Sequence, residues 1–172
     1  MSANSTTTTP AVSIRPATID DCDLILKFTQ DLALYEKALD KVEATADAFR
    51  TTLFGPTPYA HVIFATVDNS DKPVGMALYF FNYSTWKARP GLYLEDLIVD
   101  GGARAKGVGT ALMRELARVA VKQGCGRMEW SALDWNKPAI DFYLHKVKAV
   151  AMDEWTGYRL EGAALNEFAQ QA

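Results

Sequence analysis

The chain has 172 residues, of which 49% are hydrophobic and 23% charged, and its formal net charge is −3. These values are typical of a compact soluble protein, and the slightly acidic balance provides no electrostatic footprint for nucleic acid. No segment is long and apolar enough to span a membrane, and the start of the chain lacks the features of a secretory signal. We therefore expect a disordered tail over residues 1–11, a single domain over residues 12–172 and a cytoplasmic location. Cys22 and Cys125 show no metal-ligand spacing, so we expect no metal.

Hydrophobic periodicity and turn residues predict a chain in which strands and helices alternate. Strands are expected at residues 12–15, 59–67, 74–82, 92–99, 127–133, 149–152 and 156–160. Helices are expected at residues 18–35, 45–53, 108–123, 136–146 and 162–170. Strands joined by a short turn should pair antiparallel, and strands joined by a full helix should pair parallel. The prediction is an α/β (mixed α+β) fold, with a mixed, mostly antiparallel, twisted sheet of six to seven strands and helices on both faces.

The clearest functional signal lies between the apolar strand 92–99 and the helix that follows it. The turn between them contains the pattern Arg104-x-x-Gly107-x-Gly109. Free N–H groups and the dipole at the start of a helix favour a bound phosphate, and glycine lets a ligand approach the backbone closely. The pattern matches neither G-x-G-x-x-G nor G-x-x-x-x-G-K-[ST]. By itself it is equally consistent with an ordinary turn from strand to helix.

Several motifs together resemble the GNAT acetyltransferase superfamily and, within it, the diamine acetyltransferases that act on spermidine and spermine, thialysine or ornithine. They are Ile14–Ala17, Leu92–Val99, Arg104-x-x-Gly107-x-Gly109, Trp135-Asn136-x-Pro138-Ala139-Ile140-x-Phe142-Tyr143, Asp153–Trp155 and Tyr158–Leu160. The resemblance runs from about residue 12 to residue 160. It implies a GNAT fold, acetyl-CoA as cosubstrate and a homodimer. Val147 and Lys148 stand where the family usually has a helix-ending glycine, so we expect the turn there to differ.

The resemblance places acetyl-CoA along the central strand, the glycine turn and the start of two helices. The main chain of the strand would pair with the pantetheine arm like an added strand, and the N–H groups of residues 105–110 would hold the pyrophosphate. Asn136 could bind pantetheine, cap its own helix, or do both. The expected cofactor-binding residues are Leu97, Ile98, Val99, Arg104, Ala105, Lys106, Gly107, Val108, Gly109, Thr110, Asn136, Pro138, Ala139 and Tyr143.

Acyl transfer to an amine requires a base, because at pH 7 only about one alkyl amine in 2,500 is neutral when its pKa is ~10.4. We expect Glu95 to be that base, since an ionisable residue on a central strand needs a cleft or a partner. A structural carboxylate paired with an arginine is the alternative. By strand alternation, Glu95 should share a face with Tyr93 and Leu97, while Asp96 faces the other side with Leu94.

Tyr143 is the expected general acid, because the leaving thiolate needs a proton and the resemblance places this hydroxyl beside the cofactor. A core-packing role is the alternative, since an aromatic residue at helical spacing is usually buried.

A second ammonium of the substrate would bind carboxylates, and aromatic rings would add cation–π attraction. The expected substrate-binding residues are Tyr35, Glu36, Glu95, Asp96, Glu129, Trp130 and Glu154, together with Asp153. Each of these could also be an ordinary surface or packing residue.

The predicted function is an acetyl-CoA-dependent N-acetyltransferase that acts on a primary amine of a small diamine, polyamine or basic amino acid. Neither cysteine indicates an acyl-enzyme, so we expect direct transfer in a ternary complex. Two alternatives stay open: a protein or peptide N-acetyltransferase on the same fold, and a non-catalytic CoA-binding module. The expected partners are a small cationic amine and a second copy of the chain, without nucleic acid or membrane.

Overall fold

The computed structural model describes residues 10–171, and the chain divides into two compact units, Met1–Trp135 and Asn136–Ala172. The first unit holds the β-sheet with the helices on its two faces, and the second unit is helical. Most of the predicted N-terminal tail, residues 1–9, lies outside the described residues. The carbonyl of Ala11 accepts a hydrogen bond from the N–H of Asp68 at 2.9 Å, so the last residue of that segment is tied to the sheet.

The sheet has five strands in the order β1-β2-β3-β4-β5. The strands are β1 (Val12–Pro16), β2 (His61–Val67), β3 (Gly75–Ser84), β4 (Arg89–Val99) and β5 (Met128–Trp130). The predicted hairpin is confirmed, because β2 and β3 pair antiparallel, and so is the parallel pairing of β4 with β5 across a helix. The pairing rule fails for β1 and β2, which are antiparallel although helices join them. Two successive helices separate these strands, and each reverses the chain, so the second strand returns in the opposite direction.

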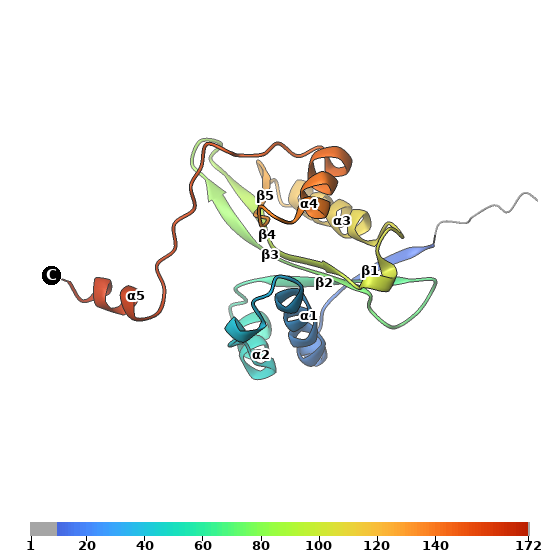
Figure 1. Cartoon of the computed structure of the whole chain (residues 1–172), viewed down its shortest axis with the longest axis horizontal. Coiled ribbons are helices and arrows are strands. Elements are labelled where there is room, and N and C mark those ends of the chain that lie inside the picture. Colours follow the sequence, from blue (N-terminus) through green and yellow to red (C-terminus); the bar gives the residue numbers. More distant parts are fainter. Residues whose placement is uncertain (1–9, 172) are drawn as a thin grey trace, which may run out of the picture. The chain divides into compact units, whose positions relative to one another are not determined.

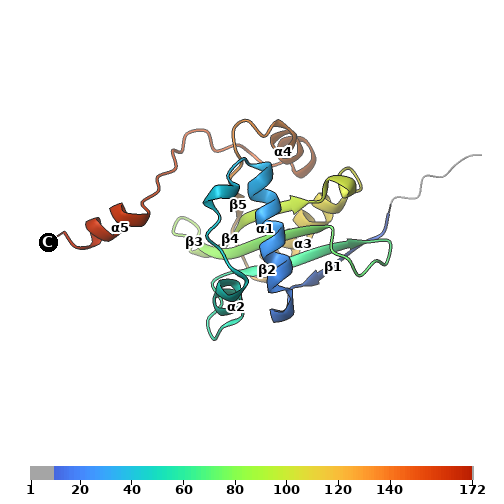
Figure 2. The same cartoon turned by 60° about the horizontal axis from the view of Figure 1, so that its bottom comes forward.

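Two helices cover one face of the sheet and a third covers the other (Figure 1). They are α1 (Cys22–Tyr35) and α2 (Ala46–Phe54) on the first face, and α3 (Val108–Lys122) on the second. Figure 2 shows α1 lying across the strands. Both predicted start signals operate: Thr18 donates its N–H to Asp21 at 2.7 Å ahead of α1, and Thr45 accepts from the N–H of Ala48 at 3.1 Å at the start of α2. Short 3₁₀ turns complete this unit: η1 (Ile19–Asp21), η2 (Leu39–Lys41) and η3 (Gly101–Ala103).

The core of this unit lies on both sides of β3 and β4. On the α1 face, Phe28 packs its ring 5.8 Å from that of Phe64, and both side chains are almost fully buried. Each large apolar side chain buried in this way contributes about 1.5–3 kcal/mol. On the α3 face, Gly75 lets the helix approach closely, because a Cβ there would lie 2.9 Å from Val108. The central strands are therefore fixed between two helical layers.

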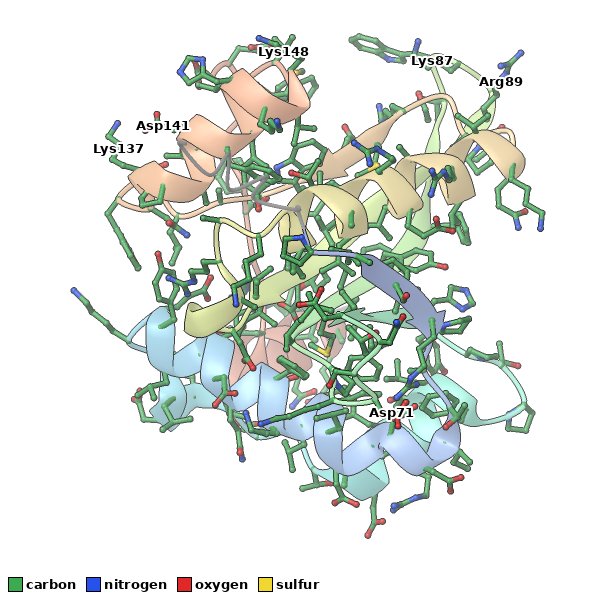
Figure 3. All side chains as sticks on the ribbon, turned by 90° about the vertical axis from the view of Figure 1, so that its right-hand side faces the viewer. Asp71, Lys87, Arg89, Lys137, Asp141 and Lys148 are labelled. Atoms are coloured by element: carbon green, nitrogen blue, oxygen red, sulfur yellow. The ribbon has the colours of Figure 1, made fainter. Side chains whose placement is uncertain are left out.

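The second unit begins with α4 (Lys137–Asp141), which continues into the π-helical turn η4 (Phe142–Val147) and is followed by α5 (Gly162–Ala169). The helix ends after Val147 without a glycine. Lys148 takes the left-handed conformation with φ 66, which glycine adopts most easily, and the N–H of Ala149 then donates to the carbonyl of Tyr143 at 3.0 Å. The lysine thus ends this helix in a left-handed conformation, and Figure 3 shows its side chain at the end of the helix.

The prediction of six to seven strands is wrong, because the sheet contains five. The segments 149–152 and 156–160 form no strand, and every residue from 150 to 161 is exposed. The segment 127–133 forms only the short β5. A strand requires a neighbour for its backbone hydrogen bonds, and among the described residues no strand pairs with the segment 149–160. The alternating pattern over residues 149–160 therefore does not predict a strand correctly, because pairing depends on a neighbour that the local sequence does not specify.

Candidate active site

The turn from β4 to α3 provides a group of backbone N–H donors. Ala105 and Gly107 both take left-handed conformations, with φ 63 and φ 83, and Gly107 caps α3. The first hydrogen bond of the helix runs from the N–H of Ala111 to the carbonyl of Gly107, at 2.9 Å. The N–H groups of residues 108–110 precede that bond, and within the described chain no backbone carbonyl accepts from them or from the N–H groups of Ala105 and Gly107. Such an array suits an anionic ligand.

The two basic residues of this turn have different surroundings. Arg104 donates its Nε to the carbonyl of Val99 at 3.3 Å, and its guanidinium lies 4.9 Å above the ring of Tyr35 at the end of α1. The N–H of Lys106 differs from its neighbours because it donates, at 3.4 Å, to the carbonyl of Ala103. Five of the six predicted N–H donors are therefore without a backbone partner, and Arg104 connects the turn to α1.

A β-bulge in β4 lies at Glu95. Leu94 pairs with Tyr79 and Asp96 pairs with Leu78, the next residue on β3, so Glu95 is left without a partner on that strand. Its side chain is exposed. A bulge of this kind inserts one residue and changes the direction of the side chains around it, which is why bulges are common next to active sites.

The bulge makes the predicted alternation of β4 wrong. Tyr93 pairs with Phe80 and Leu97 pairs with Ala77, and these two residues of β3 are three positions apart, so they face opposite sides of the sheet. Glu95 therefore does not share one face with both Tyr93 and Leu97. For the same reason Asp96 and Leu94, which pair with adjacent residues of β3, lie on opposite faces. Asp96 pairs with Leu78, which packs in the same core cluster as Phe28 of α1, so Asp96 is on the α1 face of the sheet and Leu94 is on the α3 face.

The outer edge of β4 becomes unpaired after the bulge. β4 and β5 pair only from Leu92 to Leu94 and from Met128 to Trp130, whereas β4 continues to Val99. In the part of the chain that the structure describes, no strand pairs with residues 95–99 on that side. Residues 97–99 therefore have no strand partner on that edge in the described chain, and the carbonyl of Val99 accepts a hydrogen bond from Arg104.

Three carboxylates lie close enough to interact where β4 passes the end of α1. Burial, together with the negative charges of Glu95 and Glu36, raises the pKa of Asp96 to about 6. Burial also raises the pKa of Glu36, the residue that ends α1. Among the described residues, no lysine or arginine forms an ion pair with Asp96. A cation placed beside these carboxylates would relieve both the desolvation and the repulsion.

Two basic residues and two aromatic rings form a continuous series beside these carboxylates, which we call the stacked series. Arg104 lies over Tyr35, the rings of Tyr35 and Trp135 lie 6.0 Å apart, and Lys37 places its Nζ 5.5 Å from the centre of the Trp135 ring. The sequence did not single out Lys37 or Trp135 as site residues. The available signal was adjacency, since Lys37 follows Glu36 and Trp135 precedes Asn136.

The predicted substrate residues on β5 have structural partners. The carboxylate of Glu129 forms an ion pair with Arg127 at 2.7 Å and accepts a hydrogen bond from the amide of Asn82 at 3.1 Å. Trp130 is half-buried and pairs with Leu94 at the last position of the β4–β5 ladder. The geometry therefore connects Glu129 to the end of the β3–β4 hairpin, near the turn that carries Lys87 and Arg89 in Figure 3.

In the second unit, the predicted residues gather on α4 and η4. The side chain of Asn136 accepts from the N–H of Ala139 at 3.4 Å, so the capping role is present. Pro138 lies in the first turn, where its missing N–H costs nothing. Tyr143 is half-buried in the π-helical turn, and its ring lies 5.4 Å from that of Phe142. π-Helical turns are rare and frequently occur at functional sites. Glu154 and Asp153 are exposed between η4 and α5.

A separate hollow of about 320 Å³ lies at the start of β2 and is lined mainly by apolar residues. Its ionisable neighbours include His61, Tyr79 and Glu115, and Glu115 already pairs with Arg118. Within residues 10–171, no three His, Cys, Asp or Glu side chains come together as a metal site. Over the same residues, every helix is too short or too polar to cross a membrane.

Comparison with known proteins identifies the family. The family model described as Acetyltransferase (GNAT) family matches residues 27–147, which include β4, the glycine turn, α3, α4 and η4. The chain belongs to this family. It is therefore an acyltransferase, and acetyltransferases of the GNAT family use acetyl-CoA.

Similar proteins cover nearly the whole of this GNAT acetyltransferase. A thialysine N-epsilon-acetyltransferase of Bos taurus is 39% identical over 166 residues, which span 92% of this chain and 97% of the relative. An L-ornithine N5-acetyltransferase of Arabidopsis thaliana is 30% identical, with 88% of this chain and 85% of the relative covered. Among solved structures, an integron cassette protein from the mobile metagenome of V. cholerae aligns with a TM-score of 0.76 and 30% identity, over 93% of this chain and 98% of that one.

Proposed function

We propose that this GNAT acetyltransferase transfers the acetyl group of acetyl-CoA to a primary amine of a small acceptor that carries a second cationic group: a diamine, a polyamine or a basic amino acid. The observation that carries the proposal is the cluster of Asp96, Glu36 and Glu95, in which the half-buried carboxylate of Asp96 has no basic partner in the described chain. An acceptor ammonium would supply the missing positive charge. The names of the thialysine and ornithine acetyltransferases, which are 30–39% identical to this chain, support the same class of acceptor.

The residues of the first unit fit acetyl-CoA. Backbone N–H groups of Ala105 and residues 107–110 have no carbonyl partner in the described chain, and an anionic diphosphate would satisfy them. The unpaired edge of residues 97–99 would accept a pantetheine amide as a strand accepts a neighbour. We propose that Arg104 and Lys106 add positive charge, and that Asn136, Pro138 and Ala139 complete the site. When bound, acetyl-CoA supplies the acetyl group as a thioester.

The proton transfers are assigned to Glu95 and Tyr143. Glu95 is exposed at the bulge, so its carboxylate is accessible to take the proton that the acceptor ammonium must lose, directly or through water. The new C–N bond forms as the thioester C–S bond breaks, and the hydroxyl of Tyr143 donates its proton to the departing sulfur. Asp96, Glu36 and Tyr35 hold the other end of the acceptor. Glu129, Trp130 and Glu154 stay predictions for that role.

We also propose that the two units form one acetyltransferase domain and that the enzyme is a homodimer. The family match runs across the boundary at residue 135, which supports one domain. Apolar side chains are exposed along the C-terminal segment: Val150, Met152, Trp155, Tyr158, Leu160, Leu165 and Phe168. An exposed apolar segment with strand-like alternation is suited to pairing with another chain. Sedimentation equilibrium should give twice the mass of the chain, and a monomer at micromolar concentration would refute the dimer.

A thiol-release assay over a panel of amines tests the proposed function. Purified enzyme is incubated with acetyl-CoA and with thialysine, ornithine, lysine, diaminopropane, putrescine, spermidine or a lysine-containing peptide. We expect acetyl-CoA-dependent thiol release with small dicationic amines, and mass spectrometry should show one added acetyl group. Activity on the peptide alone would favour a protein acetyltransferase. Binding of CoA without thiol release from any amine would favour a non-catalytic module.

A further inference from the structure

We propose that Lys37 determines acceptor specificity by binding the α-carboxylate of an amino-acid acceptor, so that the enzyme prefers an amino acid to the diamine that lacks this carboxylate. The inference rests on the proposed function, because it concerns the end of the acceptor that is not acetylated. Neither the glycine turn nor the proposed catalytic pair contains this residue. Four observations at the C-terminal end of α1 carry the proposal.

The first observation is the backbone conformation of Lys37. The chain leaves α1 through a turn in which the N–H of Ala38 donates to the carbonyl of Ala33 at 2.8 Å and the N–H of Lys37 to that of Leu34 at 3.2 Å. This pair of bonds forms a Schellman motif, whose left-handed residue is usually glycine. Lys37 occupies that position with φ 60. A side chain with a Cβ is unfavourable in this conformation, and residues held in such conformations cluster at functional sites.

The second observation is the direction of the Lys37 side chain. Its Nζ lies 5.5 Å from the centre of the Trp135 ring, at the outer end of the stacked series. Trp135 is 49% exposed, and the lysine is exposed as well, so the ammonium can reach a ligand while it stays over the ring. A cation–π contact of this kind orients an otherwise flexible side chain. Lys37 is therefore a positioned charge and differs in this respect from a freely solvated lysine.

The third observation is the charge on the neighbouring residue. Glu36 precedes Lys37 directly, and its negative charge acts on the half-buried carboxylate of Asp96. The end of α1 therefore presents negative groups and a positive group side by side. The α-carbon of an amino acid carries an ammonium next to a carboxylate. The ammonium can pair with the negative groups, and the carboxylate can pair with Lys37. A diamine carries only ammonium groups, so it would gain from Glu36 and Asp96 but would be repelled by Lys37.

The fourth observation distinguishes Lys37 from the other cation of the stacked series. Arg104 lies over Tyr35, donates to the carbonyl of Val99 and belongs to the turn proposed to bind the diphosphate. Lys37 forms no ion pair with another of the described residues and lies beside Glu36. It is therefore the cation placed to pair with an acceptor carboxylate.

Ornithine and putrescine test the proposal directly, because they differ only in the α-carboxylate. The ratio of kcat/KM for ornithine to kcat/KM for putrescine is measured for the wild type and for Lys37→Gln, Lys37→Arg and Lys41→Gln. We expect Lys37→Gln to lower this ratio at least tenfold, because the KM for ornithine rises. Lys37→Arg, which keeps the positive charge, should retain most of the wild-type ratio. Lys41 is an exposed lysine four residues further on, in η2, so Lys41→Gln should leave the ratio unchanged.

Lys37→Gly separates recognition from folding. Glycine relieves the left-handed conformation, so this variant should unfold at the same or a higher urea concentration while it loses the same selectivity. An unchanged ratio in Lys37→Gln, or an equal loss with both amines, would overturn the role of Lys37 and leave the proposed function intact. Absence of thiol release from both amines in the wild type would instead overturn the proposed function and the inference with it.

Discussion

The most direct test of the carboxylate cluster is the effect of Asp96→Asn on stability. The pKa of Asp96 is raised from 3.8 to about 6, first by burial and then by the charges of Glu95 and Glu36. A carboxyl whose pKa is raised by folding favours the protonated form in the folded state. It therefore lowers the free energy of unfolding above pH 6 and has no such effect below the unfolded pKa. Asparagine is neutral at every pH, so the substitution removes this penalty.

The magnitude follows from the rise in the pKa of Asp96 from 3.8 to about 6. Such a rise corresponds to about 3 kcal/mol, so at pH 7.5 Asp96→Asn should increase the free energy of unfolding by up to about 3 kcal/mol. At pH 4.5 the carboxyl is mostly protonated in the folded protein, and the gain should fall to about 1 kcal/mol. Urea denaturation, followed by fluorescence at both pH values, measures the two differences.

Asp71→Asn is the matched control. Asp71 is exposed in the turn between β2 and β3 (Figure 3), so its substitution should change the free energy of unfolding by less than about 0.5 kcal/mol at either pH. If Asp96→Asn destabilises the protein at pH 7.5, or stabilises it equally at both pH values, the buried-charge argument is wrong. The stabilised variant should also have a higher KM for ornithine, because the ammonium of the acceptor loses a negative partner.

Three further predictions concern Tyr143, Gly109 and Lys148. Tyr143→Phe should lower turnover at least tenfold with little change in the dissociation constant of CoA, since only the proton donor is lost; unchanged turnover would remove Tyr143 from the mechanism. Gly109→Val should abolish CoA binding in isothermal titration by crowding the backbone that faces the diphosphate, and a normal dissociation constant would place the diphosphate elsewhere. Lys148→Gly should raise the free energy of unfolding by about 0.5–1 kcal/mol, because glycine adopts φ 66 without a Cβ contact. If urea denaturation showed Lys148→Gly to be less stable than the wild type, the left-handed conformation of Lys148 would not be unfavourable.

Features that depend on neighbouring residues along the chain were predictable from the sequence. Thr18 and Thr45 mark the starts of helices through their own hydrogen-bonding groups, and the capped structures appear at those positions. The turn with Gly107 and Gly109 lies between a buried strand and a helix, as its composition predicted. Local chemistry decides these features, so a single sequence contains the information.

Features that depend on the partner of a strand were not predictable in the same way. The bulge at Glu95 arises from the register between β4 and β3, and nothing in the residues 92–99 alone indicates that one of them lacks a partner. The stacked series joins Lys37 to Trp135, which are distant in the sequence. The strands expected over residues 149–160 lack a pairing edge among the described residues. In each case the pattern is local, but the outcome depends on a distant contact.

The π-helical turn has a consequence for how this region tolerates insertions and deletions. A π-helical turn contains one residue more than an α-helical turn, and η4 directly continues α4 with Tyr143 inside it. Removal of one residue between Tyr143 and Val147 would let the segment close as an ordinary α-helix. Because a π-helical turn and an α-helical turn each complete about one revolution, the residues before and after η4 would keep their orientation about the helix axis. Deletion of one residue from a purely α-helical segment would instead rotate everything after it by about 100°, so η4 is the place in this helix where a change of length alters the exit of the C-terminal segment least.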